Sequence, residues 1–253
     1  MAEDWDFYFA RVDDAVCSIH VDLGVRIEAP IETRPWLVWV WLALRAPRAD
    51  GLASAEEAPA LQKIEDALVA TLSAVSGAQF VGRITGSSRR DFYFYATEPG
   101  EFESTVAEAL KPFEGYEYEA GSSFQPDWEQ YLRVLYPSEN NLQRMFNRRV
   151  LESLAEHGDV HEEPRKVSHF FKLPDEAARD ACRDTLAAIE FTIDSEGRSF
   201  EEDDSAGWLL TASRVDSVDA HTINGITIEL KRLAEQHAGV YDGWDCEATR
   251  PAT

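Results

Sequence analysis

The sequence predicts an α+β protein made of two consecutive ferredoxin-like sandwiches, each with an antiparallel sheet, joined by a long helix. Hydrophobic patterning produces the order β-α-β-β-α-β twice, once in each half of the chain. Between the two repeats lies an apolar stripe with the spacing of one long helix. The 253 residues are 44% hydrophobic, which supplies enough apolar surface for two cores.

The first repeat begins with Trp36–Leu44 (WLVWVWLAL), an apolar run that indicates a buried strand. Glu56–Val75 then predicts a helix, because its apolar residues recur at steps of three and four. These residues are Leu61, Ile64, Leu68 and Leu72. Two strands separated by GSSRR, a helix and a last strand complete the order, at 79–85, 91–97, 101–110 and 116–120.

The second repeat begins with the strand Val167–Lys172, and Pro174 stands where a helix is expected to begin. That helix is followed by two strands on either side of an acidic loop, then by a helix that ends at Gly239 and a final strand. The predicted ranges are 175–188, 190–194, 208–215, 219–238 and 240–246.

Two segments lie outside the repeats. Asp4–Phe9 and Ala15–Leu23 predict a hairpin that extends the first sheet. Ser138–His157 predicts a long helix, which we place between the domains, and His157–Lys166 is the expected linker. The expected domains are therefore 1–136 and 167–253, with a connecting helix and linker at 137–166.

Charge limits the classes of partner. The formal net charge is −23, and 21 acidic against 10 basic residues precede Pro126, so neither half is basic. Because nucleic acid is held by Lys and Arg at its phosphates, we expect no direct nucleic-acid binding. Such a surface attracts basic protein segments, although acidity also serves solubility alone. Three scattered Cys, no signal peptide and no bilayer-length apolar run predict a cytoplasmic protein without membrane contact.

No group of residues predicts catalysis. Gly82–Ser88 (GRITGSS) lacks the Lys of a phosphate-binding loop and precedes a strand, so it indicates a hairpin turn. His157 and His161 fall in a charged linker, where a solvated loop is favoured over a metal site. His169 is alone within a strand and indicates an edge residue. We therefore predict no enzyme activity, no metal and no cofactor.

Two features suggest partner-binding residues. Glu201, Glu202, Asp203 and Asp204 form an acidic loop between two predicted strands, either a solvated turn or a landing site for a basic segment.

The second feature is the YDGWD run in the last strand. Tyr241 and Trp244 would point to opposite faces of a strand unless Gly243 introduces a bulge. With the bulge, both rings share one face and form an aromatic site rimmed by Asp242 and Asp245. Core packing is the alternative for the two rings.

These residues resemble a known family. Over about residues 140 to 250, the sequence is similar to the bacterial regulator of ribonuclease E activity B. The stretches that carry this similarity are VSHFF at Val167–Phe171, the helix start at Pro174, WLLTASR at Trp208–Arg214 and GVYDGW at Gly239–Trp244. Members of that family are acidic ferredoxin-like proteins that inhibit ribonuclease E by binding it. The resemblance implies a non-catalytic protein that binds ribonuclease E or a related RNA-processing enzyme.

The first half resembles a different family, domain of unknown function 695. The similar stretches are DWDFYF at Asp4–Phe9, LQKIED at Leu61–Asp66, FVGRITG at Phe80–Gly86 and RDFYFY at Arg90–Tyr95. That family implies no activity. An alternative function is therefore a small-molecule sensor, with Trp36, Trp39 and Trp41 lining a pocket in this domain.

Overall fold

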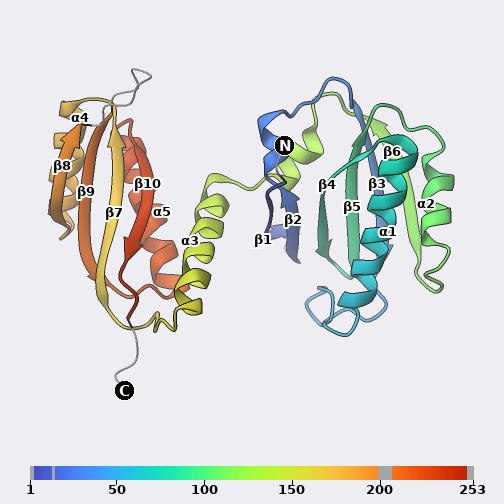
Figure 1. Ribbon diagram of the computed structural model, residues 1–253, viewed down its shortest axis with the longest axis horizontal. Helices are drawn as coiled ribbons and strands as arrows, with labels where there is room; N and C mark the ends of the chain where they lie inside the picture. Colours follow the sequence, from blue (N-terminus) through green and yellow to red (C-terminus); the bar gives the residue numbers. More distant parts are fainter. Residues whose placement is uncertain (1–2, 13–14, 199–206, 250–253) are drawn as a thin grey trace. The chain divides into compact units, whose positions relative to one another are not determined.

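The structure is a computed structural model that describes residues 3–12, 15–198 and 207–249. The chain divides into two compact units, Met1–Ser138 and Glu139–Thr253. Each unit contains its own sheet and its own helices (Figure 1). Glu201, Glu202, Asp203 and Asp204 lie outside the described residues.

Within the described residues, the first unit forms a six-stranded antiparallel sheet in the order β1-β2-β4-β5-β3-β6. Its strands are β1 (Trp5–Val12), β2 (Ala15–Asp22), β3 (Trp36–Ala43), β4 (Gln79–Gly86), β5 (Arg89–Ala96) and β6 (Tyr118–Phe124). The last four strands in this order, β4-β5-β3-β6, have the ferredoxin-like arrangement that the sequence predicts. The β1–β2 hairpin extends the sheet beyond β4, as expected.

Two helices, α1 (Ala58–Ser76) and α2 (Phe102–Leu110), cover one face of this sheet (Figure 1). The predicted stripe of α1 forms the centre of the core, with its four apolar side chains fully buried against Val38, Val40 and Phe92. Pro59 lies in the first turn of α1, and Gly77 ends the helix with a left-handed φ of 61°.

The opposite face of the sheet is covered in part by a segment that the sequence did not predict. A short 3-10 helix, η1 (Gly24–Ile27), follows β2, and a π-helical turn, η2 (Gln130–Leu135), follows β6. Trp128 stacks on Tyr95 with ring centroids 3.9 Å apart, and both are fully buried. Tyr8 on β1 donates a hydrogen bond to the carbonyl of Leu135 at 3.1 Å.

The second unit contains, in the described residues, a four-stranded antiparallel sheet in the order β10-β7-β9-β8. Its strands are β7 (Arg165–Leu173), β8 (Thr192–Arg198), β9 (Trp208–Asp216) and β10 (Val240–Cys246). Helices α4 (Glu176–Ala188) and α5 (Ala220–Gln236) pack on one face, with Cys182 and Leu230 in the shared core. This order is again ferredoxin-like.

The side chains of Asp175 and Asp219 cap α4 and α5, because their carboxylates accept the free backbone N–H groups of the first turn. The long predicted helix is α3 (Glu139–Glu156). It belongs to the second unit and packs against α5. This helix, which was expected to connect the two domains, is therefore part of the packing of the second unit.

Candidate partner-binding surface of the second unit

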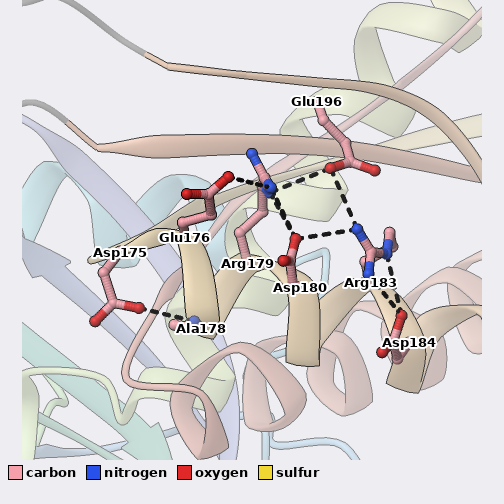
Figure 2. Close-up of polar contacts among 8 residues, drawn as sticks. All are labelled: Asp175, Glu176, Ala178, Arg179, Asp180, Arg183, Asp184 and Glu196. Carbon is pink, nitrogen blue, oxygen red and sulfur yellow. Dashed lines mark hydrogen bonds and ion pairs between the residues drawn. The ribbon is translucent and has the colours of Figure 1, made fainter.

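The exposed side of α4 carries alternating charges that reach over to β8. Arg179 and Arg183 are four residues apart and therefore project from the same face of the helix. Arg179 pairs with Asp180 at 2.7 Å and with Glu176 at 3.3 Å, and Arg183 pairs with Asp180 at 3.0 Å. Figure 2 shows both guanidinium groups directed into a row of carboxylates.

One carboxylate of this row comes from the sheet. Glu196 on β8 lies 3.1 Å from Nε of Arg179 and 3.6 Å from Nη1 of Arg183 (Figure 2). Arg183 also pairs with Asp184 at 3.0 Å. We call these six residues the α4–β8 face: Glu176, Arg179, Asp180, Arg183, Asp184 and Glu196.

Arg179 is the fixed centre of this face. Its guanidinium carbon lies 4.6 Å from the ring centroid of Trp208 on β9, within the range of a cation–π contact. The residue is only 9% exposed. Its hydrogen bond to Asp180 holds the pKa of that carboxyl below its ordinary value, so Asp180 is ionised at neutral pH.

The outer carboxylates are open to solvent. Two guanidinium groups face four carboxylates, so the α4–β8 face has a formal charge of −2. Glu176 and Asp184 each pair with a single arginine, and their side chains are 64% and 73% exposed. Exposed ion pairs contribute little to stability, so these two groups can exchange partners at small cost.

The predicted acidic loop lies beside this face in sequence. The described strands on either side of it end at Arg198 and begin at Trp208, and these two residues are paired in the sheet. Trp208 is the residue under Arg179. The described strand ends before and after this segment, Arg198 and Trp208, therefore lie next to the α4–β8 face.

The YDGWD run contains the bulge that would place both rings on one face. The register shifts between Tyr241 and Gly243, where Gly243 has a φ of 120°, so Tyr241 pairs with Phe171 and Trp244 with His169. Both rings then point into the helix-covered core.

Burial corrects part of the site prediction. Tyr241 is 7% exposed and Trp244 is 5% exposed, so neither ring is available to contact a partner. The hydroxyl of Tyr241 bonds with Nδ1 of His169 at 2.8 Å, and Nε1 of Trp244 donates to Asn147 at 2.9 Å. Because burying the large apolar area of these two rings is favourable, they pack in the core and not on the surface.

Asp242 remains exposed at the bulge. It is on β10, whereas the acidic loop follows β8, and these two strands form opposite edges of the sheet. Three strand spacings separate the edges, roughly 14 Å. The structure therefore does not bring Asp242 together with the α4–β8 face.

His169 is a core residue and not an edge residue as predicted, because β7 is an inner strand of the sheet. It is fully buried, and burial lowers its pKa to about 3, so the ring is neutral.

In the described ranges, no group of three or more His, Cys, Asp or Glu side chains is arranged to hold a metal ion. Each helix that the structure describes is also too short or too polar for a bilayer span.

The tryptophans of β3 do not line one common pocket. Trp39 and Trp41 lie on the face of the sheet opposite α1, where Trp39 packs on Gly121 and Trp41 donates to Glu119 at 2.9 Å. Trp36 lies on the other face and contacts Phe124, with ring centroids 5.3 Å apart. Alternation along the strand explains the division.

Family models match both units of the chain. Residues 3–136 match the family described as Family of unknown function (DUF695), and residues 144–246 match Regulator of ribonuclease activity B. The first match spans more than half of the 253 residues. The chain belongs to the DUF695 family. The predicted resemblances are thus confirmed, and in this DUF695 protein the second match begins within α3 and includes all four strands of the second sheet.

Other comparisons add little. No curated protein matches the sequence. A crystal structure of an unknown protein from Galdieria sulphuraria has 12% identity and a TM-score of 0.23, covering 85% of this chain and 98% of its own. A structure described as a glycine cleavage system transcriptional repressor has 8% identity and a TM-score of 0.26, covering 84% and 98%. The ferredoxin-like assignment of the two sheets rests on their strand orders.

The sequence did not single out the α4–β8 face. The spacing of Glu176, Arg179 and Arg183 could have indicated ion pairs on one helix surface. The approach of Glu196 from β8 could not, because it depends on how the helix packs on the sheet.

Proposed function

We propose that this protein is a non-catalytic cytoplasmic regulator that binds a partner protein through the α4–β8 face of its second unit. We propose ribonuclease E, or a related RNA-processing enzyme, as the partner. The match of residues 144–246 to Regulator of ribonuclease activity B is the observation that carries this proposal. The family name itself supports a regulatory role, and the identity of the enzyme is our inference.

Electrostatics support the choice of surface. The exposed carboxylates of Glu176 and Asp184 attract a basic segment of the partner. Arg179 and Arg183 reduce the repulsion between this face and acidic groups of the same partner. The net charge of −23 raises the rate of encounter with such a segment and lowers that with nucleic acid. We include Glu201, Glu202, Asp203 and Asp204 in the proposed surface because they are adjacent in sequence.

A binding experiment with matched charge variants tests the proposal. Purified full-length protein is titrated with ribonuclease E from the same organism, at several salt concentrations. We expect Glu176→Gln combined with Asp184→Asn to weaken binding about tenfold and to flatten its salt dependence. Neutralising Glu201 to Asp204 should act in the same direction.

The control removes the same number of charges from the first unit. Glu103→Gln with Glu108→Gln changes two exposed residues of α2. If the two double variants weaken binding of ribonuclease E equally, the effect comes from net charge alone, and the α4–β8 face is rejected as the binding surface. No binding of the folded protein at low salt would reject the proposed partner.

A further inference from the structure

A cleft in the first unit has the chemistry of a ligand site and is independent of the proposed partner surface. It has a volume of about 740 Å³, within the range of small-molecule sites. The β1–β2 hairpin forms one side through Trp5 and His20, and α1 forms the other through Glu65 and Asp66. It exists because the hairpin extends the sheet beyond the strands that the two helices cover.

A buried chain of polar groups lies beneath this cleft. Nη1 of Arg83 donates to Oε1 of Glu65 at 2.6 Å and to Nδ1 of His20 at 2.9 Å. Because a guanidinium only donates, Nδ1 of His20 must accept, and the proton of the neutral ring is on Nε2. Burial, with the nearby Arg83 and Arg90, lowers the pKa of His20 to about 4. His20 therefore adds no positive charge to the cleft at neutral pH.

Glu65 has one carboxylate oxygen without a hydrogen bond. The residue is 6% exposed and lines the cleft, and its Oε2 has no hydrogen-bond partner among the described residues. Nη1 of Arg90 is 4.0 Å away, beyond hydrogen-bonding distance. A buried acceptor without a hydrogen bond is costly, and in native proteins such a group calls for an explanation, for example a bound ion, a water molecule or a functional role.

The walls of the cleft are aromatic and acidic. The Trp5 ring stacks on His20 at 5.0 Å and on Phe80 at 5.1 Å between centroids, so three rings form one continuous wall. Five of the described lining residues are acidic: Glu3, Asp22, Glu28, Glu65 and Asp66. Among the same residues Arg34 is the single guanidinium, and it donates to Gln79 at 3.1 Å.

We propose that this cleft binds a small organic cation that carries a primary ammonium or guanidinium group. The Glu65 Oε2 atom and the Asp66 carboxylate accept its N–H donors, and the ring of Trp5 faces its charge. A small anion is disfavoured, because the described lining has five carboxylates and one guanidinium, that of Arg34. A bare metal ion is disfavoured, since the described residues contain no group of three ligands at metal-binding spacing.

Agmatine tests the proposal because it has a guanidinium at one end and an ammonium at the other. Calorimetric titration of the full-length protein should show agmatine and putrescine binding, with affinity that falls as salt rises. Butane-1,4-diol and succinate should not bind, since the first lacks charge and the second has the wrong sign. A blocked Ala-Lys-Ala peptide distinguishes the source: if it binds as well as agmatine, the cation is a protein side chain, and if not, a free amine.

Two variants localise the binding. Asp66→Asn changes an exposed residue of α1, and Trp5→Leu removes the aromatic face. Each should weaken agmatine binding about tenfold, equivalent to about 1.4 kcal/mol, while Glu108→Gln on α2 leaves it unchanged. Glu65→Gln should abolish binding, and circular dichroism shows whether that variant stays folded. Absence of agmatine binding at millimolar concentration, or an agmatine affinity in Asp66→Asn and Trp5→Leu equal to that of the unmodified protein, would overturn the proposal.

Discussion

Nε1 of Trp244 donates a hydrogen bond to Oδ1 of Asn147 at 2.9 Å, and this bond joins the last strand of the second unit to α3. Asn147 is fully buried, and its amide nitrogen donates to Asn224 and Thr227 of α5 at 2.8 Å each. A single side chain thus connects α3 with α5 and β10. The Trp of the YDGW run is therefore a structural residue of the second unit.

Asn147→Ala should destabilise the second unit. The substitution leaves Trp244 and Thr227 without their partners in a buried site, a loss of about 2 kcal/mol in the free energy of unfolding. Hydrogen exchange of the α3 and β10 amides during denaturant titration measures this loss for the second unit alone. Glu152→Ala, on the same helix with a side chain 64% exposed, is the control and should change it little. Unchanged exchange in Asn147→Ala would show that the bonds do not hold α3 in place.

Gly243→Ala should destabilise the bulge of β10. Gly243 has a φ of 120°, a conformation that an L side chain rarely adopts, and the strain costs about 1–3 kcal/mol. Space is not the obstacle, since the nearest atom to an added Cβ is Cε1 of Phe146 at 3.5 Å. Gly197→Ala on β8 is the matched control, because nothing lies within 4 Å of its added Cβ. Thermal unfolding of both variants compares them, and equal melting temperatures would contradict the role assigned to Gly243.

The second unit should lose stability as the pH falls below about 6.5. The pKa of His169 is about 3 in the folded chain and about 6.5 in an unfolded chain, so between these values the unfolded state binds more protons. The stabilisation from the neutral buried ring is complete above pH 6.5. It decreases towards pH 3, at up to about 1.4 kcal/mol per pH unit.

Two variants isolate this contribution. His169→Phe keeps an aromatic ring and should flatten the dependence of the unfolding free energy on pH between 6.5 and 3, even if its absolute stability is lower. His221→Gln changes an exposed residue of α5 and should leave the slope unchanged. The same slope in His169→Phe as in the unmodified chain would assign the acid sensitivity to other groups.

Arg179→Lys should lower the melting temperature of the second unit more than Arg183→Lys does. A lysine keeps the charge but cannot bond Asp180 and Glu196 with one planar group while it lies over Trp208. Arg183 makes comparable ion pairs on the same helix, but no aromatic ring of the described residues lies against its guanidinium. Differential thermal unfolding of the two variants measures the contrast. A larger effect at Arg183 would show that Trp208 does not fix Arg179.

Local patterns explain why much of the fold was predictable. The stripe of α1 and the alternation in β7 are set by side-chain directions that repeat along a helix or a strand. The bulge at Gly243 was also foreseeable as a condition for both rings to share a face, because only glycine readily adopts its φ. The turn that contains Trp128 and Tyr131 has no such period, since its conformation depends on packing against Tyr95.

The amino-acid sequence by itself determined the two β-α-β-β-α-β repeats, the hairpin before them and the acidic character of both halves. Only the tertiary structure decided that Tyr241 and Trp244 are buried, that α3 packs on α5, that Glu196 meets Arg179, and that Glu65 faces a cleft beside Trp5. The physical reason is the separation along the sequence of the residues that interact. Periodicity and charge are properties of neighbouring residues, whereas burial and pairing arise between segments that the folded chain brings together from far apart.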